Sequence, residues 1–300
     1  MSVEKAIISL PSKPQCFSIN SSSTSIICGL SSLEGKLWNG CLVNIDLVHE
    51  KQLIYQTKFG ISSVLFVNND SVLVCGDENG LITFYDISEG FEHIKVMFQK
   101  DEHESEVNQL LLCPFDSSLL LSSSTDGFIR IWDLHEYTLQ RVCENTDFST
   151  INACLWNKSR REFYSISNDR YLRVWNIDKS DFIEQYHLPY TPLSIYNTSL
   201  ETDLFIITTE EGFVLLFNMK TKQYTYISLS KLPIYCCIQL KDSLYACASD
   251  DTNIYILDIS TKQIINIIQT HSDYIRCLLK ISENQFISAS WDSTLVYHTY

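Results

Sequence analysis

The sequence lacks several features that would assign it to a class of protein. No apolar run is long enough to cross a membrane, and the N-terminal residues MSVEKAIISLPSKPQ lack the basic and then apolar order of a signal peptide. No CxxC pair occurs among the 11 cysteines, most of which lie within strand-like patterns. We therefore predict a soluble intracellular protein with reduced, buried thiols and no membrane association.

Basic residues are also scarce. The chain has 22 Lys and Arg against 36 Asp and Glu, which gives a net charge of −14. Direct binding to a nucleic acid backbone requires a basic face, so the charge argues against it. The same charge permits attraction of basic partners such as Lys- or Arg-rich tails, although ordinary solubility explains it equally well.

Motifs for catalysis are missing too. The sequence has no GxSxG nucleophile motif, and its 7 histidines are spread along the chain without carboxylates at metal-ligand spacing. We predict that the protein is not an enzyme and holds neither a metal ion nor a cofactor.

The chain does contain a repeated unit, which is clearest in LLSSSTDGFIRIWDL at Leu120–Leu134. Two alternating strands flank the turn Thr125-Asp126-Gly127, where glycine accepts a positive φ without a Cβ clash. The unit closes on Trp132 and Asp133.

The unit occurs seven times. The copies end at Asp46, Asp86, Asp133, Asn176, Asn218, Asp258 and Thr299, so their spacings are 40, 47, 43, 42, 40 and 41 residues. A period of about 40–45 residues with a Trp-Asp close is typical of four-stranded WD-repeat propeller blades. We predict an all-β, seven-bladed WD-repeat β-propeller that forms a single domain over residues 1–300.

The intervals between copies supply the other two strands of each blade. Apolar inner strands are predicted at 107–112, 151–156 and 234–239, and mixed outer strands at 139–143, 182–187 and 263–268. The last copy reaches Tyr300 on its third strand. We expect the N-terminal segment Glu4–Leu10 to complete this last blade and so to cover two strand edges.

Polar residues in the third copy predict an internal hydrogen-bonded chain formed by His103, Ser122 or Ser124, Asp126 and Trp132. The fourth copy keeps Asp169 and Trp175, and the seventh has His271, Asp273 and the turn Trp291-Asp292-Ser293. A Ser-His-Asp hydrolase triad is the competing interpretation. We reject it because a nucleophile needs an exposed, strained position and an oxyanion hole.

Two segments depart from the repeat. Leu30–Gly40 is predicted to be an insert at the hairpin tip of the first blade, carrying Trp38 either as a partner anchor or folded back on its own blade. Glu89–Glu106 includes the acidic run DEHESE. We interpret this segment as a solvated loop, or alternatively as a contact for a basic peptide.

Together these segments resemble the methylosome protein 50 family of WD-repeat proteins. The similarity is carried by LSSLEGKLWNGCL in the first blade, LVCGDENGLITFYD and QKDEHESEV in the second, and THSDYIRCLL with FISASWDSTLVYHTY at the end. Its most specific parts are Ser31–Gly40 and Trp291–His298. The likeness extends over all seven blades in register.

The resemblance implies a noncatalytic adaptor of the type II protein arginine methyltransferase, in a hetero-octamer of four enzymes and four propellers. It implies partner contacts at Trp38 and its neighbours Leu33, Lys36, Leu37 and Asn39. Histone tails and Sm-type splicing proteins would be the basic substrates, in the cytoplasm and the nucleus. The alternative is a generic WD-repeat scaffold, such as a ubiquitin-ligase substrate receptor or a histone-binding propeller.

Overall fold

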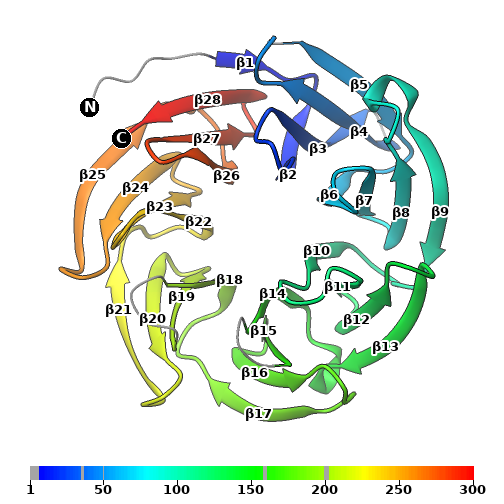
Figure 1. The fold of residues 1–300 in the computed structure, drawn as a ribbon. Coiled ribbons are helices and arrows are strands. Elements are labelled where there is room, and N and C mark those ends of the chain that lie inside the picture. Colours follow the sequence, from blue (N-terminus) through cyan, green and yellow to red (C-terminus); the bar gives the residue numbers. More distant parts are fainter. Residues whose placement is uncertain (1–6, 35–36, 50, 158–160, 199–202) are drawn as a thin grey trace. The chain divides into compact units, whose positions relative to one another are not determined.

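The computed structural model describes residues 7–34, 37–49, 51–157, 161–198 and 203–300. They form an all-β, seven-bladed propeller in which every blade is a four-stranded antiparallel sheet (Figure 1). The predicted fold class is therefore confirmed. No helix of the described ranges has the length and apolar character needed to cross a membrane.

The first four blades follow the chain in order. Their strands are β2 (Lys13–Ile19), β3 (Ser25–Glu34), β4 (Leu37–Asp46) and β5 (Gln52–Thr57) in blade one; β6 (Ile61–Val67), β7 (Val72–Asp77), β8 (Leu81–Asp86) and β9 (Lys95–Asp101) in blade two; β10 (Val107–Leu112), β11 (Leu119–Ser124), β12 (Phe128–Asp133) and β13 (Thr138–Glu144) in blade three; and β14 (Ile151–Trp156), β15 (Glu162–Ser167), β16 (Tyr171–Asn176) and β17 (Phe182–His187) in blade four. Two short 3-10 helices, η1 (Phe91–His93) and η2 (Thr146–Phe148), lie in connections.

The remaining blades repeat the pattern. Their strands are β18 (Pro192–Asn197), β19 (Leu204–Thr209), β20 (Phe213–Asn218) and β21 (Gln223–Ser228) in blade five; β22 (Ile234–Lys241), β23 (Leu244–Ser249), β24 (Asn253–Asp258) and β25 (Gln263–Gln269) in blade six; and β26 (Ile275–Ser282), β27 (Gln285–Ser290) and β28 (Thr294–Thr299), joined by β1 (Ile7–Ser9), in blade seven. The third strand of each blade ends at the residue that closes the corresponding sequence repeat.

The chain divides into two compact units, which we describe separately. Residues 15–187 hold blades one to four, apart from the first two residues of β2, and residues 1–14 with 188–300 hold blades five to seven. The prediction of a single domain therefore stays a prediction.

Apolar side chains fill the spaces between neighbouring blades within each unit. Between blades two and three, Val74 and Phe84 pack in one cluster with Leu120 and Trp132. All eleven cysteines are free and buried or half-buried, as predicted. Burial raises the pKa of the Cys28 and Cys75 thiols, which keeps them protonated and unreactive.

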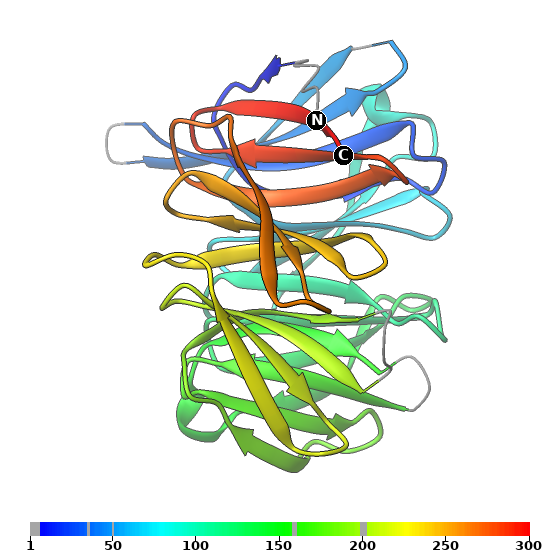
Figure 2. The same cartoon turned by 90° about the vertical axis from the view of Figure 1, so that its left-hand side faces the viewer.

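The N-terminal strand completes the last blade. β1 pairs antiparallel with β28, with Ile8 opposite Leu295 (Figure 2). Leu10 follows β1, donates its backbone N–H to the Ser293 carbonyl at 2.8 Å, and is 7% exposed. The early part of the predicted strand, Glu4 to Ala6, lies outside the described residues.

The two irregular segments contain more strand than the sequence predicts. In the insert predicted at the hairpin tip of blade one, Leu30–Glu34 and Leu37–Gly40 lengthen β3 and β4, and their register runs from Leu30 opposite Cys41 to Glu34 opposite Leu37. Glu89–Glu106 is not one solvated loop, because it contains η1 and β9, the fourth strand of blade two, and places His103 in the interior. In both cases backbone pairing along an existing strand edge outweighs the polar composition.

We expect Leu10→Ala to lower the free energy of unfolding by about 2–4 kcal/mol, because it empties a buried site beside the completing strand. Ile265→Ala, on β25 and 53% exposed, should cost under about 1 kcal/mol and serves as the control. Urea unfolding measures both values. Equal small losses in the two variants would show that β1 is not anchored in blade seven.

Candidate functional site

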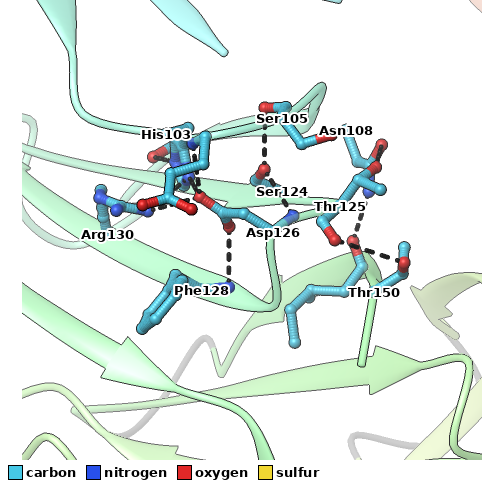
Figure 3. Close-up of polar contacts among 12 residues, drawn as sticks. His103, Ser105, Asn108, Ser124, Thr125, Asp126, Phe128, Arg130 and Thr150 are labelled. Carbon is cyan, nitrogen blue, oxygen red and sulfur yellow. Dashed lines mark hydrogen bonds and ion pairs between the residues drawn. The ribbon is translucent and has the colours of Figure 1, made fainter. Parts of the chain in front are cut away.

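A buried chain of hydrogen bonds links the strands of blade three to its turn. The Trp132 Nε1–H donates to Ser122 Oγ at 2.9 Å, and Ser122 Oγ lies 2.8 Å from His103 Nε2. His103 Nδ1 is 2.8 Å from Asp126 Oδ2 (Figure 3). Every donor in this chain meets an acceptor when Ser122 donates to Nε2 of a neutral His103 and His103 donates from Nδ1 to the Asp126 carboxylate.

Electrostatics support this protonation. Burial lowers the pKa of His103 although Asp126 pulls in the opposite direction, so the ring is neutral near pH 7. Burial alone would raise the pKa of Asp126, yet the bonds to His103 and to the turn N–H groups hold that pKa at about 2. The carboxylate is therefore charged, and Arg130 Nη1 lies 3.1 Å from its Oδ2.

Ser124 has a different role from Ser122. Its hydroxyl donates to the Ser105 carbonyl at 3.0 Å and accepts from the Asp126 N–H at 3.0 Å (Figure 3). Ser124 therefore fixes the turn and the preceding loop, whereas Ser122 joins the chain from His103 to Trp132.

Blade four keeps the turn carboxylate and the tryptophan but lacks the histidine. Trp175 Nε1–H donates to Ser165 Oγ at 2.8 Å. Arg173 donates from Nη2 to Asp169 Oδ2 at 2.6 Å and from Nη1 to Ser167 Oγ at 2.9 Å, and only 1% of Arg173 is exposed. A buried arginine thus neutralises the turn carboxylate directly.

Blade seven builds the same chain with a second histidine. His271 lies 2.9 Å from Asp292 through Nδ1 and 2.7 Å from Ser288 through Nε2. The third member is His298, whose Nε2 is 2.7 Å from Ser288 Oγ, at the strand position where blades three and four have tryptophan. The predicted Asp273 accepts a bond from Ser290 only through its backbone carbonyl, so Asp292 is the carboxylate of this blade.

These networks are structural. Ser122, Ser165 and Ser288 are fully buried, so none of these hydroxyls is positioned to attack a substrate. In the described part of the chain no three His, Cys, Asp or Glu side chains gather as metal ligands. The networks rigidify the blades, and a functional surface must be sought outside them.

The extended hairpin of blade one is one such surface. In Figure 2 the strands β3 and β4 project to the left of the picture. Asn39 lies on β4 opposite Ser32, and the backbones of Leu33, Leu37 and Trp38 continue the pairing. The side chains of Leu33, Leu37 and Trp38, and the whole of Lys36, lie outside the described residues.

A second surface lies at the turns of blades six and seven, and sequence reasoning missed it. The guanidinium of Arg276 lies 3.7 Å from the ring centroid of Tyr235 and 4.4 Å from that of Trp291, and it pairs with Asp250 at 3.2 Å. Tyr235 and Tyr274 remain 38% and 39% exposed. The members come from four separate segments, and the only signal in the sequence was the unusual turn at Trp291.

Comparison with known proteins agrees with the geometry. Residues 94–133 match the family described as WD domain, G-beta repeat. The chain is 20% identical to the Methylosome protein WDR77 of Xenopus laevis over 91% of this chain and 85% of that protein. It is 21% identical to the DDB1- and CUL4-associated factor 11 homolog of Caenorhabditis briggsae, over 82% of this chain but only 45% of that protein.

The chain is a seven-bladed β-propeller with one matched WD repeat. Its blades and turn networks are similar to those of WD-repeat propellers, a class that consists mainly of protein-interaction scaffolds. A further similarity, 24% identity to the GATOR2 complex protein WDR59 of Mus musculus, covers 48% of this chain and 15% of that protein. We therefore describe the protein as a scaffold, and the choice among these relatives belongs to its proposed function.

We expect Asp126→Ala to lower the free energy of unfolding by about 3–5 kcal/mol, because it leaves His103 and Arg130 buried without their carboxylate. Asp178→Ala is the matched control, since Asp178 pairs with Arg161 on the surface with both side chains more than half exposed. That variant should lose less than about 1 kcal/mol. Similar urea midpoints for the two variants would contradict the assigned role of Asp126.

Stability should also depend on pH through His298. Burial and the nearby His271 lower its pKa to about 4, against about 6.5 in an unfolded chain. The unfolded state therefore binds more protons between these values, and the free energy of unfolding should fall by up to about 3 kcal/mol as the pH drops from about 6.5 to about 4.

His298→Gln tests this dependence, because glutamine does not titrate. Urea unfolding between pH 7 and pH 4 should show a shallower loss of stability in the variant, with the remaining slope due to groups such as His103. An identical slope in the two proteins would exclude His298 as a titrating group of the folded state.

Proposed function

We propose that the protein is a noncatalytic adaptor subunit of a protein arginine methyltransferase complex. The proposal rests on the extent of the similarity to the Methylosome protein WDR77. The match covers 91% of this chain and 85% of that protein. The other relatives described above match this chain over less than half of their own length. A shared propeller alone would not favour one of these functions over another.

The blade-one hairpin is the proposed contact with the enzyme. Its two ten-residue strands, β3 and β4, are the longest of the described elements. An aromatic side chain at the end of a long hairpin is suited to enter a pocket on a partner, where tryptophan is enriched among hot-spot residues. We assign Trp38 as this anchor, with Leu33, Lys36, Leu37 and Asn39 around it, in a hetero-octamer of four enzymes and four propellers.

The acidic surface suits the basic substrates of such an enzyme, such as histone tails and Sm-type splicing proteins. The net charge of −14 accelerates encounter with a basic chain, and long-range attraction requires no dedicated pocket. We further propose that the complex acts in the cytoplasm and the nucleus, and that the subunit binds neither nucleic acid nor membranes directly.

A substrate receptor of a ubiquitin ligase is the second candidate, favoured by the similarity to the DDB1- and CUL4-associated factor 11 homolog. The two candidates differ in their stable partner. Affinity purification of the tagged protein, followed by mass spectrometry, should recover an arginine methyltransferase at a stoichiometric level. Recovery of a cullin adaptor instead would favour the second candidate.

The Trp38→Ala variant tests the anchor. We expect it to weaken the complex with the methyltransferase by about 2 kcal/mol or more, which is about a 30-fold rise in Kd, while the melting temperature stays nearly unchanged. Tyr224→Ala, which removes a 42% exposed aromatic from β21, is the control and should bind normally.

Size-exclusion chromatography with light scattering and a direct titration measure the two effects. Intact binding together with a large fall in melting temperature would show that Trp38 packs on its own blade. That result would remove the hairpin anchor from the proposal.

A further inference from the structure

Blade two differs from blades three and four at one buried position. In blade three Arg130 lies opposite Ser122, and in blade four Arg173 lies opposite Ser165. The corresponding pair in blade two is Thr83 opposite Cys75. Threonine is too short to fill the space that the guanidinium takes in the other two blades, and it carries no charge.

A turn carboxylate remains in blade two without that arginine. Asp77 is 6% exposed, and its Oδ1 accepts the backbone N–H groups of Asn79 and Leu81, each at 2.9 Å. Asp77 ends β7 at the position that Ser124 has in blade three, and it caps the turn as Ser124 does. Within the residues that the structure describes, no Lys, Arg or His forms an ion pair with Asp77.

The space left by the missing arginine is a cavity of about 270 Å³. Asp77 and Thr83 line it from blade two, and the aromatic residues Tyr55, Phe59 and Tyr85 form much of its wall. Ligand pockets for drug-sized molecules measure about 300–1,000 Å³, so this volume suits a single long side chain. The cavity lies entirely within the unit of residues 15–187.

The electrostatic environment favours a cation. Burial raises the pKa of Asp77, and the charges of Glu78 and Asp101 add to this effect. The N–H groups of Leu81 and Asn79 offset it only in part. Lys58 also lines the cavity, but it is exposed and its ammonium group lies over the Phe59 ring, 4.8 Å from the centroid. A positive guest would neutralise Asp77 and gain from the aromatic walls.

We propose that the blade-two cavity binds the side chain of an arginine from a partner peptide. The protein itself provides the template, because Arg173 pairs with a turn carboxylate in blade four while its guanidinium lies 5.0 Å from the Tyr171 centroid and 5.4 Å from that of Phe182. The planar guanidinium forms two directed bonds to a carboxylate and stacks on aromatic faces, which an ammonium does less well. We take the basic substrates of the methyltransferase as the source of this arginine, so the assignment rests on the proposed function.

The test is a binding titration with a defined probe. A fluorescein-labelled, C-terminally amidated decapeptide of alternating Gly and Arg is titrated with the full chain, and fluorescence anisotropy gives Kd. Matched peptides carry Lys or the neutral isostere citrulline in place of Arg. We expect the Arg peptide to bind more tightly than the Lys peptide, and the citrulline peptide to bind at least about tenfold more weakly than the Arg peptide.

Two variants locate the site. Asp77→Asn keeps the acceptor for the two turn N–H groups but removes the charge, and Thr83→Arg fills the cavity with an internal guanidinium. Each should weaken binding of the Arg peptide at least about tenfold. Glu136→Gln, an exposed residue of blade three, changes the net charge as Asp77→Asn does and should leave Kd unchanged.

Equal Kd values for Asp77→Asn, Glu136→Gln and the original protein would overturn the proposal, because binding would then reflect only the overall negative charge. Equal binding of the citrulline and Arg peptides would overturn it as well. Binding to the methyltransferase is measured separately in the same variants. If the protein binds the methyltransferase but its peptide binding does not depend on Asp77, only the arginine site in the cavity is refuted. If peptide binding depends on Asp77 but the protein does not bind the methyltransferase, only the proposed function is refuted.

Discussion

Blades two, three, four, six and seven each place a carboxylate at the turn between their second and third strands, where it is buried or half-buried. A carboxylate there caps the turn by accepting backbone N–H groups, as Asp126 does for Phe128 and Asp169 for Tyr171. Burial of a carboxylate costs free energy unless a cation or several donors compensate for the lost water. The way each blade compensates its carboxylate determines what fills the neighbouring interior.

The blades meet this requirement with different partners. Blade four uses Arg173 directly, and blade three combines Arg130 with His103. In blade six the Tyr255 hydroxyl donates to Asp251 at 2.5 Å, and in blade seven His271 and Thr294 bind Asp292. Among these blades only blade two has its carboxylate two positions earlier, at Asp77, with backbone donors but no ion pair among the described residues. The departure in one copy of a repeat is therefore the basis for the proposed arginine site.

The repeat period and the alternation of apolar residues were sufficient to predict the propeller and the residues at which the third strands end. The repeat period also predicted that one blade contains His103, Ser122, Asp126 and Trp132, because equivalent positions of successive repeats occupy equivalent positions in successive blades. The completing strand was predictable because the N-terminal segment has an apolar strand pattern that belongs to no repeat, and this segment pairs with β28. These are features of period and register, which a sequence records directly.

Features that depend on what a side chain meets across space were harder to predict. Arg130 and Arg173 look like ordinary strand residues until the structure places them beside turn carboxylates. His298 could not be recognised as a substitute for tryptophan, since only its distance to Ser288 reveals the role. The strand character of Leu30–Glu34 and Leu37–Gly40 was hidden by glycine and polar residues, and backbone pairing decided it. The cavity at Asp77 arises from an absent side chain, which sequence patterns do not display.

The central claim is that the protein neutralises the turn carboxylates of blades three and four with its own cations but leaves that of blade two without one. NMR titration of the protein labelled with ¹³C at the aspartate carboxyl groups measures this most directly. The account predicts that Asp77 titrates above the usual aspartate pKa of 3.8, that Asp126 titrates at about 2, and that the pKa of Asp77 falls when the Arg peptide is added. A pKa of Asp77 as low as that of Asp126 in the free protein would contradict the account, because a cation of the chain itself would then occupy the site.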